Sequence, residues 1–304
     1  MKTKNASHKG LGFLLIVSLI IINLSVMAQD VNQPLLKDYN SISIYKIPIT
    51  QVNQAAFPVI DIHSHDYANT DEDVAQCVKN MDLCGIQKTI ILSGATGDKF
   101  NSAIKKYGKY GARFEIWCGF DYTGFDKRGY GPAAVKELER CFKMGAKGVG
   151  ELSDKGLGVY NAGLVKSNGM HYDDARMKPL YEKCAELHMP INVHIADPIW
   201  MYEKMDATND GLMNAEKWRI NLTKHGIDGF NALIHTLENA VKNNPKTTFI
   251  ACHFANLNHD IAKLGEMLDK YPNLYADISA RYGESATIAS ATEAFYVKYQ
   301  NRLL

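Results

Sequence analysis

The chain has 304 residues, of which 46% are hydrophobic and 22% are charged, a composition typical of a folded globular protein. Its 34 basic and 33 acidic residues give a formal net charge of +1. This balance, without a basic stripe, argues against nucleic acid as a partner.

The first 28 residues have the pattern of a secretory signal peptide. Lysines precede an uncharged run, residues 10–29, and the small or apolar residues Val26 and Ala28 suit cleavage after Ala28. The uncharged run is also long enough to span a bilayer, so an uncleaved anchor is the alternative. Cleavage predicts a periplasmic or secreted protein that no longer has a membrane attachment.

Residues 29–57 carry no chemical motif, and we expect them to form an N-terminal arm packed on the domain that follows. From residue 58 onward, short apolar runs alternate with amphipathic stretches. The apolar runs predict strands at 58–64, 88–94, 114–121, 147–153, 189–197, 247–254 and 273–279. The amphipathic stretches predict helices at 71–85, 98–110, 131–145, 175–188, 231–244, 258–270 and about 286–299.

Seven strand–helix units in one continuous pattern predict a parallel sheet, and an eighth would close a (β/α)8 barrel. The alternative is an open, doubly wound sheet. It is disfavoured because no glycine-rich phosphate loop follows the first strand. We therefore predict an α/β fold, with residues 58–304 forming a TIM barrel.

Histidines and one glutamate stand at the ends of the predicted strands, where parallel barrels place their active residues. His63 and His65 end the first strand, Glu151 the fourth, His194 the fifth and His253 the sixth. Alternate residues of a strand share a face, so both imidazoles of the first strand can point into the barrel mouth. Imidazole and carboxylate together are a typical ligand set for Zn²⁺ or a similar divalent cation.

Each of these residues also has a structural interpretation. A single strand-end histidine is more often a hydrogen-bonded core residue, but three strands that all end in histidine favour a metal site. The case for Glu151 is weaker, because an ion pair with Lys147 or Lys155 would explain it as well.

The long segment 198–230 is the candidate for a substrate-binding loop or lid, and it carries Trp200 and Arg219. An ordered surface insertion without substrate contact is the alternative. Asp197 and Arg281 also lie near strand ends, where they could orient a ligand or pair with each other.

Four motifs together resemble the amidohydrolase superfamily, in its amidohydrolase-related branch: "FPVIDIHSH", "INVHIADP", "FIACHFAN" and "YPNLYADISARYGE". The resemblance covers about residues 57–304. It implies a metal-dependent barrel enzyme that hydrolyses C–N or C–O bonds of a small molecule through a metal-activated water, with zinc as the expected metal. His63 and His65 match the strand-one pair of the family, and His194 and His253 match its later histidines. The resemblance also places His253 where it could stabilise a developing oxyanion.

The strand-four position determines the expected number of metal ions. Glu151 resembles the bridging glutamate of some family members, and Lys155 follows four residues later. If Glu151 binds metal, two ions are expected, and otherwise one.

The family also ends its eighth strand with an aspartate, which is not found before Leu304. We therefore expect an incomplete barrel whose eighth strand is largely missing, and poor activity of this 304-residue form. Two alternative functions remain: a nonhydrolytic, metal-dependent decarboxylase, and an exported binding protein that has lost its chemistry. The sequence also leaves a homo-oligomer open.

Overall fold

A computed structural model describes residues 35, 38–48, 51–52, 55–161, 166–218 and 220–304. The chain divides into two units, Met1–Asn53 and Gln54–Leu304. The predicted signal peptide lies outside the described residues, and the packing of the arm stays a prediction. In the described part of the chain, no helix is long and apolar enough to cross a membrane.

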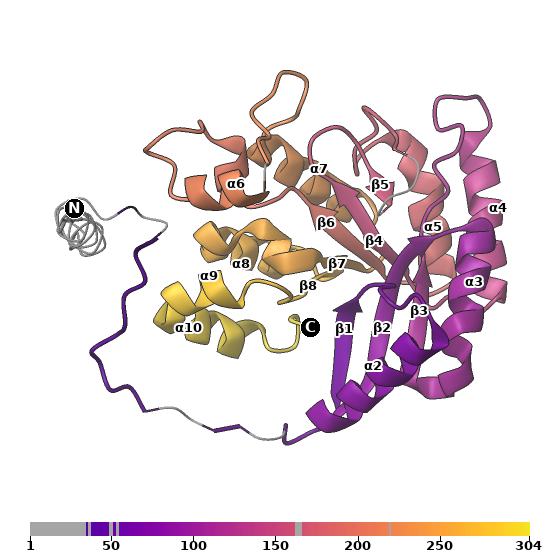
Figure 1. Ribbon diagram of the computed structural model, residues 1–304. Coiled ribbons are helices and arrows are strands. Elements are labelled where there is room, and N and C mark those ends of the chain that lie inside the picture. Colours follow the sequence, from indigo (N-terminus) through magenta and orange to yellow (C-terminus); the bar gives the residue numbers. More distant parts are fainter. Residues whose placement is uncertain (1–34, 36–37, 49–50, 53–54, 162–165, 219) are drawn as a thin grey trace, which may run out of the picture. The chain divides into compact units, whose positions relative to one another are not determined.

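The second unit is built on a parallel sheet that curls into part of a (β/α)8 barrel, as predicted (Figure 1). Neighbouring strands follow the chain order β1, β2, β3, β4, β6, β7 and β8. Their bounds are Val59–Ser64, Ile86–Ala95, Phe114–Cys118, Val149–Asp154, Ile191–Ile195, Phe249–Ala251 and Leu274–Ala276. A two-residue strand, β5 (Tyr160–Asn161), pairs antiparallel with β4 inside a region predicted as loop.

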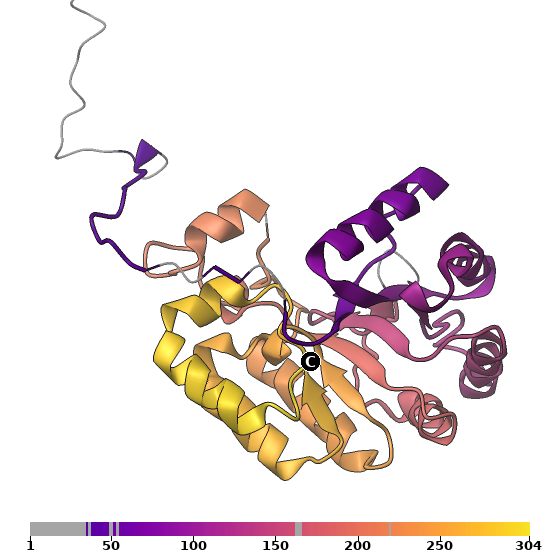
Figure 2. The same cartoon turned by 90° about the horizontal axis from the view of Figure 1, so that it is seen from below.

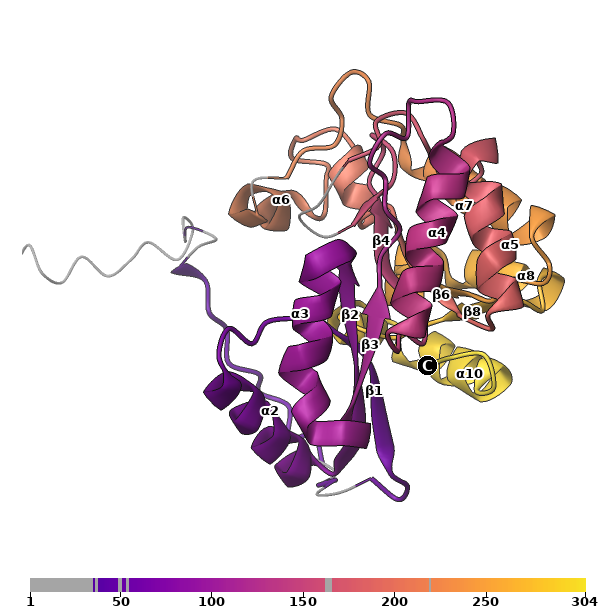
Figure 3. The same cartoon turned by 90° about the vertical axis from the view of Figure 1, so that its right-hand side faces the viewer.

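Helices surround the outside of the curved sheet, as the view from below shows (Figure 2). The longer ones are α2 (Asp71–Cys84), α3 (Gly97–Tyr107), α4 (Tyr130–Lys143), α5 (Lys178–Glu186), α7 (Phe230–Asn243), α8 (Ile261–Lys270) and α10 (Ala289–Tyr299). Figure 3 shows α2, α3 and α4 along one side of the sheet. The start of α2 is encoded locally, because Thr70 and Asp73 form a capping box.

The structure adds short elements and corrects some predicted boundaries. The segment after β6 contains a 3₁₀ turn, Ile199–Tyr202, and helix α6 (Leu212–Trp218). The predicted helix near 286–299 is two helices, since α9 (Tyr282–Thr287) precedes α10. Further 3₁₀ turns of the second unit, within the described residues, are Gly108–Arg113, Ala175–Met177, Cys252–Asn256 and Asn258–Asp260.

Two apolar clusters hold the strands rigidly. Along β2, Ile91 packs into the large layer between sheet and helices. Its neighbours Ile90 and Leu92 face the barrel interior, where they form a second cluster with Trp117 and Ile250. This alternation follows from the two-residue period of a strand. Because both faces are packed, the strand ends are fixed supports for functional side chains.

The last three residues run parallel to β8, along the edge of this strand that does not pair with β7. Leu303 forms a parallel bridge with Ala276. The Leu304 N–H donates to the Ala276 carbonyl at 2.9 Å, and the Ile278 N–H donates to the Leu304 carbonyl at 3.1 Å. Residues 302–304 therefore occupy the position of a further barrel strand.

Candidate metal centre

The four predicted histidines and Glu151 lie together at the C-terminal ends of the strands. His63 stands in β1 and His194 in β6. His253 was predicted within a strand, but it lies in the turn just after β7. Potential ligand atoms lie within 4.8 Å of one another in each of three sets: His63, His65 and Glu151; His63, Cys252 and Asp277; and Glu151, His194 and His253. Glu151 is common to the first and the last of these sets.

A glycine brings Glu151 close to His194. A Cβ atom on Gly150 would lie 2.7 Å from the Cβ of Asn192 in β6, so only glycine permits this close approach of β4 and β6. As a result, Glu151 Oε1 lies 2.5 Å from His194 Nδ1 and 3.7 Å from His253 Nε2. The second carboxylate oxygen, Oε2, lies 3.5 Å from His65 Nε2.

Hydrogen bonds orient three of the imidazoles. Their Nδ1 atoms face oxygen acceptors: Asp277 Oδ2 for His63 (2.8 Å), the Leu92 carbonyl for His65 (3.3 Å) and the Ser279 carbonyl for His253 (2.9 Å). An Nδ1–H that donates to such an acceptor leaves the Nε2 lone pair of a neutral imidazole free. This is the tautomer in which Nε2 can bind a cation.

His194 has a carboxylate on each side. Its Nδ1 faces Glu151, and its Nε2 lies 3.2 Å from Asp197 Oδ1. Burial lowers the pKa of His194, but the nearby charge of Glu151 and the hydrogen bond to Asp197 outweigh it, so the pKa is raised. The charge of Glu151 therefore favours a positive charge between its carboxylate and His194, and this charge can be a proton or a metal cation.

The buried charges support a cation site. Burial opposes ionisation of Glu151, but the charge of the nearby His194 and its hydrogen bond to the carboxylate outweigh it and hold the pKa of Glu151 far below its usual range. Burial lowers the pKa values of His65 and His253, so both are neutral at neutral pH, as metal ligands must be.

Asp277 belongs to this site, although it was not among the predicted ligands. It is fully buried just after β8. One carboxylate oxygen accepts hydrogen bonds from the backbone N–H groups of His253 (2.8 Å) and Ser279 (3.1 Å). The other faces His63 Nδ1 and accepts from the Asn192 side chain at 3.2 Å. Its position at a strand end was the available signal, but its contact with the first strand depends on the curl of the sheet.

The predicted substrate residues have different surroundings. Asp197 pairs with Lys155 at 2.8 Å rather than with Arg281, and Lys155 is thereby engaged away from Glu151. Trp200 and Arg281 line a cavity of about 590 Å³ on the same side of the sheet. Arg219 lies outside the described residues.

The residues present fit a divalent cation. The buried carboxylate of Glu151 is surrounded by imidazoles, and three of them have Nε2 lone pairs that hydrogen bonds at Nδ1 leave free. Nitrogen-rich sets with one carboxylate are typical of zinc and related metals. The carboxylate–histidine contact of Asp277 and His63 is the usual outer support of such ligands.

The fold agrees with solved structures of low sequence identity. An uncharacterized TIM-barrel protein from Bordetella bronchiseptica is 13% identical, with a TM-score of 0.51, over 82% of this chain and 84% of that one. A 2,6-dihydroxybenzoate decarboxylase, solved with 2,6-dihydroxybenzoate, is 15% identical, with a TM-score of 0.50 over 81% and 87% of the two chains. The third is a 5-carboxyvanillate decarboxylase from Novosphingobium aromaticivorans, complexed with manganese and 4-hydroxy-3-methoxy-5-nitrobenzoic acid. It is 12% identical, with a TM-score of 0.50, over 84% and 88% of the two chains.

The sequence itself identifies the family. A search of curated proteins finds no match. The family profile described as Amidohydrolase matches residues 62–304, a range that begins just before His63 and includes every candidate ligand. The chain therefore belongs to the amidohydrolase family.

Proposed function

We propose that the protein is a metal-dependent hydrolase that cleaves a C–N or C–O bond of a small molecule. The observation that carries this proposal is the buried carboxylate of Glu151, which is shared by two sets of potential ligands. We propose zinc as the metal, with His63, His65, Glu151, His194 and His253 as its ligands. The shared carboxylate allows two ions, one in each set.

A bound divalent cation would supply Lewis acidity, which lowers the pKa of a coordinated water. The residues of the chain would prepare the site for it. Asp277 holds the proton of His63 at Nδ1 and thereby keeps Nε2 available. Glu151 is a ligand rather than a proton acceptor, because its pKa is held too low for an effective base near neutral pH.

The role of His253 follows from its hydrogen bond. Its Nδ1 faces the Ser279 carbonyl, so Nε2 of the neutral ring has a lone pair and no proton to donate. Donation to an oxyanion would need the imidazolium, and burial lowers the pKa of His253. We therefore propose His253 as a ligand in preference to the oxyanion-stabilising role expected from the sequence.

Metal content and turnover test the proposal together. The protein without residues 1–28 is stripped with a chelator and reloaded with zinc or manganese, and aryl esters and anilides are then assayed. We expect hydrolysis that depends on metal and is lost in Glu151→Gln. The matched control Glu266→Gln, at an exposed position of α8, should bind the same amount of metal as the wild type. Full hydrolysis by metal-free protein would contradict the proposal.

A nonhydrolytic decarboxylase is the second candidate. A histidine set around one ion would also serve that reaction, and two of the solved structures with a similar fold are decarboxylases. Release of CO₂ from a panel of aromatic acids, without hydrolysis of esters or amides, would favour it. Metal binding with neither activity would favour a binding protein that has lost its chemistry.

We also propose export, with cleavage after Ala28. The mass of the intact protein from its native host should match a chain that starts at Gln29. A full-length chain recovered with the membrane would favour the uncleaved anchor. We propose a small-molecule substrate and no nucleic-acid partner, and gel filtration would show whether the protein forms a homo-oligomer.

A further inference from the structure

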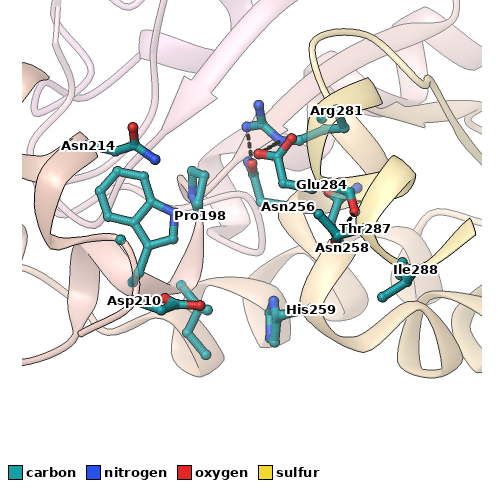
Figure 4. Close-up of a pocket in the computed structure, with 14 residues that line it drawn as sticks. Pro198, Asp210, Asn214, Asn256, Asn258, His259, Arg281, Glu284, Thr287 and Ile288 are labelled. Carbon is teal, nitrogen blue, oxygen red and sulfur yellow. Dashed lines mark hydrogen bonds and ion pairs between the residues drawn. The ribbon is translucent and has the colours of Figure 1, made fainter. Parts of the chain in front are cut away.

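A cavity of about 590 Å³ opens beside the metal centre, between the segments that follow β6, β7 and β8. Figure 4 shows Pro198 and Asn214 on one side of it and Arg281, Glu284 and Thr287 on the other. None of these residues belongs to the ligand sets of the metal centre. The cavity is thus separate from these ligand sets and lies on the same side of the sheet.

Arg281 is a partly buried cationic group of this cavity, with a side-chain exposure of 13%. Its guanidinium donates to Asn256 Oδ1, and Asn256 in turn donates to the carbonyls of Ile195 and Ala196 at the end of β6. The Nε atom of Arg281 is buried and has no hydrogen-bond partner, and Glu284 approaches it only to 4.0 Å. A fixed, incompletely paired guanidinium of this kind favours binding of an anion, in particular a carboxylate, whose shape matches its fork.

Trp200 provides a flat wall in the same cavity. A Cβ atom on Gly211 would lie 2.1 Å from the indole Cδ2, so the ring packs directly against the backbone of residue 211. The Trp200 carbonyl also accepts a hydrogen bond from the side chain of Asn209 at 2.9 Å. The ring is held in place before any ligand arrives, which lowers the entropic cost of packing a planar group against it.

One short segment connects this cavity to the metal centre. In the segment after β8, the Asp277 carboxylate faces Nδ1 of His63, and the Ser279 carbonyl faces Nδ1 of His253. Arg281 follows and lines the cavity. Three alternate residues thus serve the two sites. A molecule anchored at Arg281 would therefore lie near the histidines of the candidate metal centre.

We propose that the cavity is the specificity subsite of the enzyme, in which Arg281 binds a substrate carboxylate and Trp200 packs against the planar body of the substrate. The inference deepens the proposed hydrolase function and rests on it for the position of the scissile bond. Asp210 and Glu284 also line the cavity, so a monoanion is preferred over a phosphate dianion.

Binding of benzoate, benzamide and phenyl phosphate to the zinc-loaded protein tests the proposal by calorimetry. The three probes share a planar ring and differ in charge. We expect benzoate to bind at least tenfold more tightly than either of the other two. Arg281→Gln should weaken the binding of benzoate at least tenfold and leave the binding of benzamide unchanged. Arg281→Lys should weaken benzoate binding by an intermediate factor. The control Arg128→Gln, at an exposed position before α4, should match the wild type.

Thermal unfolding verifies that each variant is folded. If Arg281→Gln does not fold, the comparison of Arg281→Lys with the wild type still tests the proposal. Gly211→Ala displaces the Trp200 ring, so it should weaken the binding of benzoate and the binding of benzamide by the same factor. Benzoate binding that is unchanged in folded Arg281 variants would mean that the carboxylate goes to the metal, and would overturn the proposal. Tighter binding of phenyl phosphate would overturn the carboxylate assignment. Arg281-dependent benzoate binding without ester or amide hydrolysis would instead leave this subsite standing and refute the proposed hydrolase.

Discussion

Replacement of Asp277 by asparagine removes one negative charge and nearly preserves the shape of the side chain. The remaining oxygen can keep the two backbone donors, His253 N–H and Ser279 N–H. The new NH₂ group then faces His63 Nδ1 and the side-chain nitrogen of Asn192. His63 must move its proton to Nε2 in order to accept from the amide, and it then no longer offers a lone pair to the metal.

Two consequences have different magnitudes. Loss of an outer carboxylate that orients a metal-binding histidine typically lowers metal affinity by about 10–100-fold, which is about 1.4–2.8 kcal/mol. In the metal-free protein, the lost charged hydrogen bond and the unsatisfied Asn192 donor should each cost about 1–3 kcal/mol. The total of about 2–6 kcal/mol compares with a net stability of about 5–15 kcal/mol for a typical domain, so over most of that range the variant stays folded.

Competition titrations with a zinc chelator measure the affinity, and urea unfolding of metal-free protein measures the stability. Asp269→Asn is the matched control, because Asp269 is an aspartate with 57% side-chain exposure that pairs with Lys298 at the surface. Its effect on stability should stay below about 1 kcal/mol, with unchanged zinc affinity. If folded Asp277→Asn bound zinc within twofold of the wild type, the assigned tautomer of His63 would be refuted.

Three further predictions concern charge and pH. Asp197→Asn removes the charged acceptor of His194 Nε2, so zinc affinity should fall about tenfold, and an unchanged dissociation constant would contradict this role. Zinc affinity should rise with pH above 6.5, because the pKa values of His63 and His194 are raised and protons then compete with the metal for their imidazoles. A zinc affinity that stays constant between pH 6 and 8.5 would count against this prediction. Hydrogen bonds from Arg140 outweigh burial and lower the pKa of Glu137 to about 2, below the unfolded value of 4.5. The stabilisation from Glu137 is therefore complete above pH 4.5 and is lost as pH falls toward 2, so Glu137→Gln should cost about 1 kcal/mol at pH 7 and less at pH 3, as urea unfolding would show.

Much of the architecture follows from local sequence. Alternating apolar runs and amphipathic stretches predicted the parallel sheet, because strand and helix periods depend only on nearby residues. The strand-end rule also placed His63, His65, Glu151 and His194 on one side of the sheet, where the structure has them. The family resemblance that these motifs carry agrees with the profile match over residues 62–304.

Other features depended on the tertiary structure. The predicted strand through His253 ends at Ala251, and His253 to Asn256 have positive φ angles of 53–57°, a conformation that local propensity disfavours. It is held by the hydrogen bond from the His253 N–H to Asp277, which lies 24 residues away along the chain. Such a contact between distant residues leaves no signal in the local periodicity of the sequence.

The partners of charged side chains were also decided in three dimensions. From the sequence, Lys155 could pair with Glu151, and Asp197 with Arg281. In the structure Lys155 pairs with Asp197, and Arg281 binds Asn256 instead. These choices depend on how the loops after β4, β6 and β8 fold back over the strand ends. Periodicity predicts which residues reach those ends, but only the packing of distant segments decides which side chains meet there.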